Sequence, residues 1–326
     1  MMMNKVVVIT TGGTIAMSED LRSRTVKPID QDTLDQMMPF LEDYRPVQMD
    51  HFINIPSPHM TPEIMYQLAL HMNQYLENKD VSGIVITHGT DTLEETAYFL
   101  DLLITSEKPV VLTGAMRSSN ELGADGPLNL VNSVRVAKDP TSRGKGVLVV
   151  FNDEIHAARY VTKTHTSNVA TFQSPANGPI GTVTKKGIRF SHAPLIRDNY
   201  PLVPPNGKIG LIKAAVGMDD LLIHTYIDNN YQGIVIEALG QGNLPPKMLN
   251  GIKRAVENKI PIVLVSRSFN GFVDDVYDYE GGGKQLKKLG VIFSNGLNGQ
   301  KARIKLMVTY HLFKNGQEDL QKYFDR

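Results

Sequence analysis

The sequence contains no cysteine among its 326 residues. That absence excludes disulfide bonds, thiolate nucleophiles and metal sites built on cysteine, although it does not fix the compartment. An excess of charge is also missing, because 34 basic residues balance 34 acidic ones. No field of one sign would draw the chain onto nucleic acid or an anionic membrane, so we expect neither as a partner.

Long hydrophobic runs are absent as well. No stretch approaches the roughly 18–20 apolar residues of a membrane span. The first apolar run, Val6–Thr10, is shorter than the roughly 7–15 residues of a secretory signal core. We interpret it as a core strand and expect a cytoplasmic protein for the chain as written. The alternative is a secreted or periplasmic protein from which a leader was removed.

Strand-like and helix-like segments alternate along the chain. Lys5–Thr10 is typical of a strand buried on both faces. Thr61, Pro62 and Glu63 supply the N-cap, the first-turn proline and the acidic first turn of a helix. The apolar positions of that helix are Met65, Leu68, Ala69, Met72 and Leu76. The alternation predicts an α/β fold: a larger N-terminal, mostly parallel sheet domain with helices on both faces, and a smaller C-terminal α/β domain.

A proline-rich stretch interrupts the alternation. Four of the 18 prolines lie between Pro194 and Pro205, and this density suits neither a helix nor a central strand. We therefore predict an N-terminal domain over 1–192, a linker over 193–206 and a C-terminal domain over 207–326.

Hydroxyl, carboxylate and glycine residues follow several of the predicted strands. Ligands bind beyond the carboxyl ends of the strands in open parallel sheets, so these residues predict a small-molecule site. They are Thr11–Thr14 after the first strand, Ser57 after a strand expected at Phe52–Ile55, His88–Thr92, Gly114–Ala115 and Gln241–Asn243.

The segment around Thr90 has two interpretations. The first is structural: Asp91 with Glu94, or Thr92 with Glu95, forms a capping box for the following helix. The second makes Thr90 a nucleophile, which requires a neighbouring base because a hydroxyl is otherwise too weak.

Lys163 is the candidate base, since a lysine accepts a proton when its surroundings favour the neutral amine. Taken alone, Lys163 is more typical of a solvated surface lysine, and Thr14 is more typical of a helix cap than of a catalytic residue. Other catalytic patterns are missing, because the sequence has no G-x-S-x-G elbow, no H-E-x-x-H zinc motif and neither glycine-rich phosphate motif. We expect no metal and no cofactor.

Taken together, these motifs resemble those of the bacterial L-asparaginase family, most closely its type II branch. The resemblance spans nearly the whole chain in one order, and its pair of threonine motifs is highly specific. The matching motifs are TTGGTIA at 10–16, ITHGTDTLEETAYFL at 86–100, VVLTGAMR at 110–117, ADGPLNL at 124–130, ARYVTKTHT at 158–166, GQGNL at 240–244 and LNGQKARI at 297–304.

The resemblance implies roles for the matching residues of the N-terminal domain. Thr14 matches the primary nucleophile on the side-chain amide. Thr90, Asp91 and Lys163 match a second triad, in which Lys163 accepts or relays a proton and Thr90 helps to activate water or attacks in its own right. Ser57 and Asp91 match residues that hold the α-carboxylate and α-amino group of the substrate.

The resemblance also implies a shared site. Ala115 matches a position whose backbone faces the reacting amide, and Asn243 matches a residue that reaches across a subunit interface. Glu280 is our candidate for the glutamate that the partner subunit supplies. The family forms homotetramers as dimers of intimate dimers, so we expect the C-terminal domain to contribute to the active site of the partner.

Two positions depart from the family pattern. A tyrosine that activates the nucleophile is usual in the loop before Thr-Val, and this chain has Arg24, whose guanidinium cannot act as a base. After Ser57 the family commonly has Gln or Glu to grip the α-amino group, whereas Pro58 offers no side-chain hydrogen bond. We expect weak glutaminase activity.

The resemblance implies an amidohydrolase that converts L-asparagine and water to L-aspartate and ammonia through an acyl-enzyme. Within the family, the alternative is the deaminating subunit of a tRNA-dependent amidotransferase. We expect extra length and basic residues for RNA in such a subunit, and the chain has neither. A non-catalytic amino-acid-binding module is the alternative from another class, and the joint presence of Thr14, Thr90, Asp91 and Lys163 disfavours it.

Overall fold

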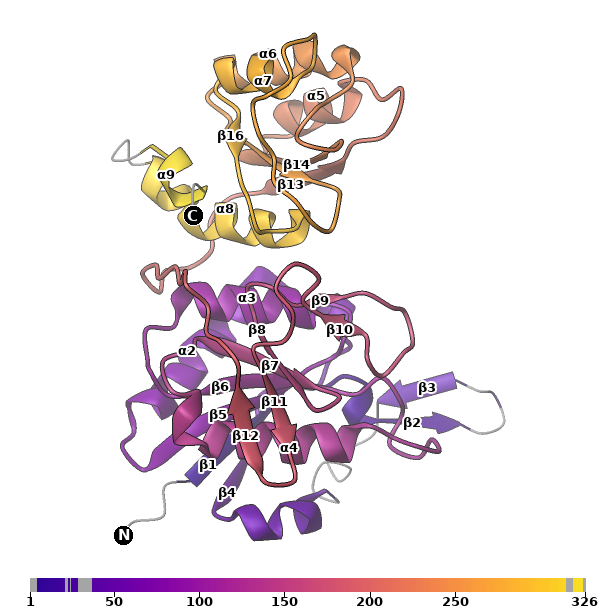
Figure 1. Ribbon diagram of the computed structural model, residues 1–326, viewed down its shortest axis with the longest axis vertical. Coiled ribbons are helices and arrows are strands. Elements are labelled where there is room, and N and C mark those ends of the chain that lie inside the picture. The colour runs from indigo at the N-terminus through magenta and orange to yellow at the C-terminus, as the bar shows by residue number, and fades with distance from the viewer. Residues whose placement is uncertain (1–4, 21–22, 24, 29–36, 315–318, 325–326) are drawn as a thin grey trace. The chain divides into compact units, whose positions relative to one another are not determined.

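The structure is a computed structural model that describes residues 5–20, 23, 25–28, 37–314 and 319–324. The chain divides into two compact units, Met1–Leu202 and Val203–Arg326, whose elements are labelled in Figure 1. The division falls inside the proline-rich stretch. Each unit is an α/β structure of its own, as the sequence predicts.

The first unit is built on an eight-stranded sheet with the order β12-β11-β8-β7-β6-β5-β1-β4. Its strands from β4 to β7 pair in parallel, and β8, β11 and β12 continue the sheet as antiparallel strands. The bounds are β1 (Lys5–Thr10), β4 (Val47–His51), β5 (Val81–Thr87), β6 (Val110–Thr113), β7 (Val147–Phe151), β8 (Glu154–Ala157), β11 (Gly181–Thr184) and β12 (Gly187–Phe190).

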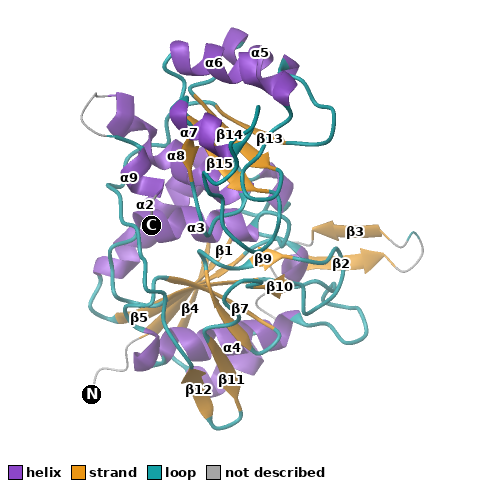
Figure 2. Ribbon diagram, turned by 45° about the horizontal axis from the view of Figure 1, so that its top comes forward, coloured by secondary structure: helices purple, strands orange, loops and turns teal. Residues whose placement is uncertain are grey.

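Helices cover both faces of this sheet. In Figure 2, α2 (Pro62–Glu77) and α3 (Leu93–Leu103) lie above it and α4 (Gly126–Lys138) lies below it. Two short ribbons complete the unit, β2 (Met17–Asp20) with β3 (Thr25–Pro28) and β9 (Thr162–Lys163) with β10 (Phe172–Gln173). The 3₁₀ helices are η1 (Thr14–Ala16), η2 (Met38–Tyr44), η3 (Ser57–His59) and η4 (Pro140–Ser142).

The local signals explain β1 and α2. Val6, Val7, Val8 and Ile9 are all fully buried, which is the expected pattern for a parallel strand covered on both faces. At the start of α2, the Thr61 hydroxyl accepts a hydrogen bond from the backbone N–H of Ile64. The residues that α2 buries are the five predicted, Met65, Leu68, Ala69, Met72 and Leu76.

The strand expected at Phe52–Ile55 is a wrong prediction. The strand is β4, which ends at His51, and the next residues form a loop whose backbone N–H groups bond to Thr10 and Thr11. β4 is the edge strand and is only half-buried, so its sequence VQMDH lacks the apolar run by which an inner strand is recognised.

The second unit is a four-stranded parallel sheet with the order β13-β14-β15-β16. Helices α5 and α6 pack together, and α8 packs against β13, β14 and β15. The strands are β13 (Ile209–Lys213), β14 (Gly233–Ala238), β15 (Ile262–Ser266) and β16 (Ile292–Phe293). The helices are α5 (Leu221–Asp228), η5 (Pro246–Met248), α6 (Leu249–Glu257), α7 (Gly283–Lys288), α8 (Gly299–Lys314) and α9 (Gln321–Phe324). In the described part of the chain, no helix is both long and apolar enough to cross a bilayer.

Candidate active site

The carboxyl ends of β1 and β5 place two candidate threonines on neighbouring loops. The two strands are paired in parallel up to Thr10 and Thr87. Beyond them, the backbone N–H of Thr11 donates to the Thr87 carbonyl at 3.0 Å, and the Thr11 hydroxyl donates to the same oxygen at 2.8 Å. Thr14 follows Thr10 by four residues and Thr90 follows Thr87 by three, so both threonines lie just past the same edge of the sheet.

Glycines allow three loops to meet at this edge. Gly13 has a φ of +90°, and a Cβ atom added to it would lie 2.4 Å from the Cα of Gly89. A Cβ added to Gly89 would lie 2.7 Å from the Cβ of Ser57. Any side chain at Gly13 or Gly89 would separate these loops. The segments that carry Thr14, Thr90 and Ser57 are therefore in contact with one another.

The β9 ribbon brings Lys163 to the second threonine. The Nζ atom of Lys163 lies 3.0 Å from Oγ1 of Thr90 and 2.7 Å from Oδ1 of Asp91. Thr90 is buried, whereas the Asp91 side chain is 61% exposed and Lys163 lies between them at 16%. The hydroxyl, the amine and the carboxylate thus form a connected chain that runs from the interior to the surface.

Ser57 fixes the start of α3. Its hydroxyl accepts from the backbone N–H of Asp91 at 3.2 Å, and its carbonyl accepts from the Thr92 hydroxyl at 2.8 Å. Thr92 occupies the N-cap position of α3 but makes no side-chain capping bond. The alternative in which Thr92 and Glu95 form the capping box is therefore wrong, because the Thr92 hydroxyl donates to Ser57 instead.

Glu94 is a residue that the sequence reasoning assigned only to capping. It is 5% exposed, and its Oε1 atom accepts from the Thr162 hydroxyl at 2.9 Å and from the backbone N–H of Lys163 at 3.2 Å. The carboxylate therefore ties β9 to the first turn of α3. The only signal in the sequence was an acidic residue on the apolar side of a helix.

His88 lies directly before the Gly89-Thr90 pair and is fully buried. Burial lowers the pKa of its imidazole to about 4, so the ring is neutral near pH 7. Nδ1 lies 2.8 Å from the Gly89 carbonyl and Nε2 lies 2.9 Å from Oγ1 of Thr96. Since a carbonyl only accepts, we assign the proton to Nδ1, and Nε2 accepts from the Thr96 hydroxyl. His88 is thus a packed residue that orients the loop.

Asp125 holds the loop that carries Ala115. Its carboxylate accepts from the backbone N–H groups of Met116 and Arg117 at 3.0 and 2.9 Å. The Asn129 side chain of α4 adds a bond to the Gly114 carbonyl at 3.1 Å. Ala115 is buried between these anchored residues, so its backbone is held rigidly at the end of β6.

Of the two departures in the sequence, the structure describes only the one at Pro58. Arg24 lies outside the described residues. The β2–β3 ribbon that flanks it is tied to the first unit through Ser119, whose backbone N–H and hydroxyl both donate to the Met17 carbonyl. Pro58 is the second residue of η3 and is exposed, next to the buried Ser57.

Asn243 and Glu280 lie together in the second unit, just past the carboxyl end of β14. The Asn243 Oδ1 atom accepts from the backbone N–H of Gly283 at 3.2 Å. Leu244 donates its N–H to the carbonyl of Gly281, the residue after Glu280, and Glu280 itself is exposed. The structure therefore places the loop of Asn243 against the segment that directly follows Glu280.

Comparison with known families gives one result for each unit. The family model described as "Asparaginase, N-terminal" matches residues 5–196, and the model "Glutaminase/Asparaginase C-terminal domain" matches residues 208–324. The chain belongs to the asparaginase family. The family resemblance noted in the sequence is thereby confirmed, and Thr14, Thr90 and Lys163 lie within the N-terminal match.

Relatives with similarity over almost the whole chain carry two kinds of name. An L-asparaginase from Bacillus licheniformis is 36% identical over 98% of this chain and 99% of its own length. L-asparaginase 2 from Escherichia coli K12 is 35% identical over 98% of this chain and 92% of its own length. One subunit of a glutamyl-tRNA(Gln) amidotransferase from Methanococcus maripaludis is 32% identical over 94% of this chain and 75% of its own length.

Metal ligation has no candidate in the described ranges. Among those residues, no group of three or more His, Asp or Glu side chains is placed to hold a metal ion. The expectation that no cofactor is needed stays a prediction.

Proposed function

We propose that this protein hydrolyses the side-chain amide of L-asparagine to L-aspartate and ammonia, with a threonine hydroxyl as the nucleophile. The observation that supports this most strongly is the position of the Lys163 amine, within 3.0 Å of the Thr90 hydroxyl and 2.7 Å of the Asp91 carboxylate. These groups lie beside the loop of Thr14, and the relatives named L-asparaginase are similar to this chain along nearly their whole length.

The chemistry follows in two stages. Thr14 Oγ1 attacks the amide carbon, and its proton passes to the departing nitrogen. The carbon–nitrogen bond then breaks, so that ammonia departs and an aspartyl ester remains on the threonine. A water molecule then attacks the ester carbon, which releases aspartate and returns the proton to Thr14. Backbone N–H groups of the anchored loops stabilise the oxyanion in both stages.

Lys163 and Thr90 act as the proton relay. In its neutral form, Lys163 accepts a proton from the Thr90 hydroxyl, which in turn takes a proton from the attacking water. The Asp91 carboxylate stabilises the ammonium that forms, because it already lies at ion-pair distance from Nζ. As the ester bond breaks, the ammonium returns this proton through Thr90 to Thr14 Oγ1, and Lys163 is neutral again. The exposed face of Asp91 is directed to the α-ammonium of the substrate, with Ser57 and the backbone of Ala115 completing the pocket.

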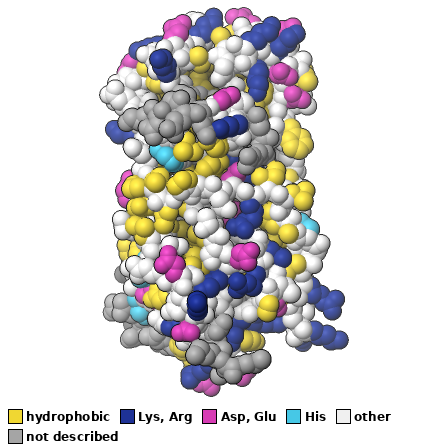
Figure 3. Space-filling model, turned by 90° about the vertical axis from the view of Figure 1, so that its left-hand side faces the viewer, with side chains coloured by type: hydrophobic (Ala, Val, Ile, Leu, Met, Phe, Trp, Pro, Cys, Tyr) yellow, Lys and Arg dark blue, Asp and Glu magenta, His cyan; other side chains and the backbone are white. Residues whose placement is uncertain are grey.

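Free asparagine suits this chain better than an amidated tRNA. The balanced charge of the chain offers no basic excess for RNA. Acidic and basic side chains lie interspersed on the face drawn in Figure 3.

Weak glutaminase activity is part of the proposal. Glutamine is longer than asparagine by one methylene, so its α-amino end must shift to keep the carbonyl at the nucleophile. Pro58 cannot hold that end, because its ring has no polar atom.

The cytoplasmic location also stays a prediction, which cell fractionation tests.

We also propose that the sites are shared between copies in a homotetramer made of two intimate dimers. The loop after β15 exposes apolar side chains beside Asn243, and an exposed apolar patch of this kind marks an interaction surface. Val273 packs against Gly242 in this loop, and Asp274 donates its N–H to the Gln241 carbonyl. The exposed side chains are Phe269, Phe272, Val276, Tyr277 and Tyr279.

Mixing of variant subunits tests this assembly. Thr14→Ala and Asn243→Ala variants are expected to be nearly inactive alone and to regain activity when unfolded and refolded together, because some mixed sites combine an intact Thr14 with an intact Asn243. Sedimentation velocity gives the oligomeric state. A fully active monomer, or no regain in mixed oligomers, contradicts a shared site.

The activity itself is tested by ammonia release. Purified protein is incubated with L-asparagine, L-glutamine or no amide, and ammonia and aspartate are measured together. We expect equal amounts of both products from asparagine and little ammonia from glutamine. Binding of asparagine without any ammonia would support the non-catalytic module instead.

A further inference from the structure

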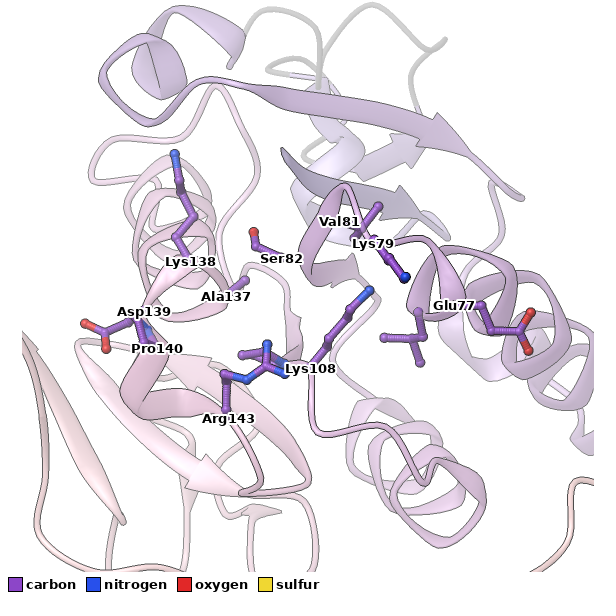
Figure 4. A pocket seen from close by; sticks show the side chains of 12 residues that line it. Glu77, Lys79, Val81, Ser82, Lys108, Ala137, Lys138, Asp139, Pro140 and Arg143 are labelled. Atoms are coloured by element: carbon purple, nitrogen blue, oxygen red, sulfur yellow. The ribbon is translucent and has the colours of Figure 1, made fainter. Parts of the chain in front are cut away.

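A second cavity lies at the opposite end of the parallel strands from the candidate active site. It has a volume of about 610 Å³ and is lined where β5 and β6 begin and where α4 ends (Figure 4). A strand rises about 3.3 Å per residue, so the seven residues of β5 separate this cavity from the Thr90 loop by roughly 20 Å. The cavity is therefore distinct from the site described above.

Four basic side chains line this cavity, which we call the basic hollow: Lys79, Lys108, Lys138 and Arg143. They come from separate segments, and Figure 4 shows those of Lys79, Lys108 and Arg143 extending into the same space. Lys138 donates to the carbonyls of Tyr44 at 2.7 Å and Arg45 at 3.1 Å. Its ammonium already makes two hydrogen bonds to the protein, so we assign the site to Lys79, Lys108 and Arg143, of which only Lys108 makes one such bond.

The two carboxylates at the rim do not neutralise these cations. Glu77 accepts from the Asn73 side chain at 3.2 Å. Asp139 accepts from the backbone and the hydroxyl of Thr141 at 2.8 and 2.6 Å. In the described part of the chain, neither the Lys79 ammonium nor the Arg143 guanidinium has a hydrogen bond or an ion pair of its own.

Lys108 is held close to a like charge. Its Nζ atom donates to the Asn78 carbonyl at 2.5 Å, and partial burial together with the positive charge of Arg143 lowers the pKa of its ammonium. An anion that binds between Lys108 and Arg143 offsets the repulsion of their two positive charges. It also accepts hydrogen bonds from the donors that have no partner.

We propose that the basic hollow binds the phosphoryl group of a small phosphorylated molecule. A guanidinium donates two parallel hydrogen bonds to a phosphate, and lysine ammoniums supply point charges for its remaining oxygens. The volume lies within the range of roughly 300–1,000 Å³ typical of small-molecule sites, so it leaves room for more than the phosphate. Apolar side chains such as Leu76, Val81 and Pro109 line the remainder of the cavity and suit a ring.

Isothermal titration calorimetry on the full-length protein tests this site. The probes are inorganic phosphate, AMP and adenosine, in a buffer matched for ionic strength with chloride. The variants are Lys108→Met and Arg143→Gln. Arg143 is exposed, and in the described ranges only its backbone N–H makes a hydrogen bond, which the substitution keeps. Lys186→Met, at an exposed lysine in the β11–β12 turn, is the matched control.

We expect saturable binding of phosphate, AMP or both, weakened at least about tenfold in each hollow variant and unchanged in the control. If AMP binds and inorganic phosphate does not, the nucleoside that carries the phosphate contributes to recognition. No saturable binding of either anion, equal binding by all variants, or adenosine binding as tightly as AMP would overturn the proposal. Asparagine turnover is expected to be the same in all variants without phosphate, which verifies their folding.

Discussion

Replacing Glu94 by glutamine is expected to disturb catalysis through Lys163. Glu94 is not one of the proposed reacting groups, and its carboxylate accepts from the Thr162 hydroxyl and from the Lys163 backbone N–H. The side chain of Lys163 then reaches back to Thr90, four residues before Glu94. The variant keeps the shape and one acceptor oxygen, removes the charge and replaces the second oxygen with an NH2 donor.

The expected magnitude follows from these two hydrogen bonds. Bonds to a charged acceptor contribute roughly 1.5–3 kcal/mol each and neutral ones roughly 0.5–1.5 kcal/mol, so the free energy of unfolding should fall by about 2–3 kcal/mol. A looser β9 also misplaces the amine, and a shift of about 1 Å in a catalytic group costs up to 10²-fold in rate. We therefore expect kcat/KM for asparagine to fall by about 10- to 100-fold at a temperature where the variant is folded.

A double-mutant cycle separates positioning from general destabilisation. If Glu94 acts through Lys163, then Glu94→Gln should lower kcat in the wild-type protein and have little further effect in a Lys163→Ala background. Glu63→Gln is the matched control, because Glu63 is also a first-turn acidic residue but is exposed on α2. An equal loss in both backgrounds would refute the positioning role.

Two further predictions address specificity and pH. Pro58→Gln should raise the ratio of kcat/KM for glutamine over asparagine above a wild-type value of about 10⁻², and comparable wild-type values for the two amides would contradict the role of Pro58. Because the folded state holds the pKa of His88 near 4, below the ordinary value of about 6.5, only the unfolded chain binds this proton between those values. The free energy of unfolding should therefore fall by about 3 kcal/mol as pH falls from 6.5 to 4, and His88→Gln should remove this contribution. An NMR titration that placed the His88 pKa near 6.5 would contradict this.

Local signals in the sequence predicted much of the fold. The apolar run of β1 and the cap and periodicity of α2 depend on residues that are close in the chain, so they could be read directly. β4 was placed five residues too late, because an edge strand is half-exposed and lacks that run.

The candidate site was only partly predictable. The family motifs identified Thr90 and Lys163, but their contact joins residues 73 positions apart and depends on the β9 ribbon. Glu94 was assigned to a capping box because its neighbours on β9 cannot be known from local spacing. Likewise, the Thr92 hydroxyl donates to the Ser57 carbonyl and does not cap its own helix. This tertiary hydrogen bond replaces the local one that the sequence suggests.

The most direct test of a threonine-based amidohydrolase is the turnover of L-asparagine by Thr14→Ala and Thr90→Val, each verified as folded by circular dichroism and thermal unfolding. Each change removes part of one acyl-transfer unit, so we expect kcat to fall by at least about 10³ in both variants. Wild-type turnover in either folded variant would contradict the role assigned to that threonine.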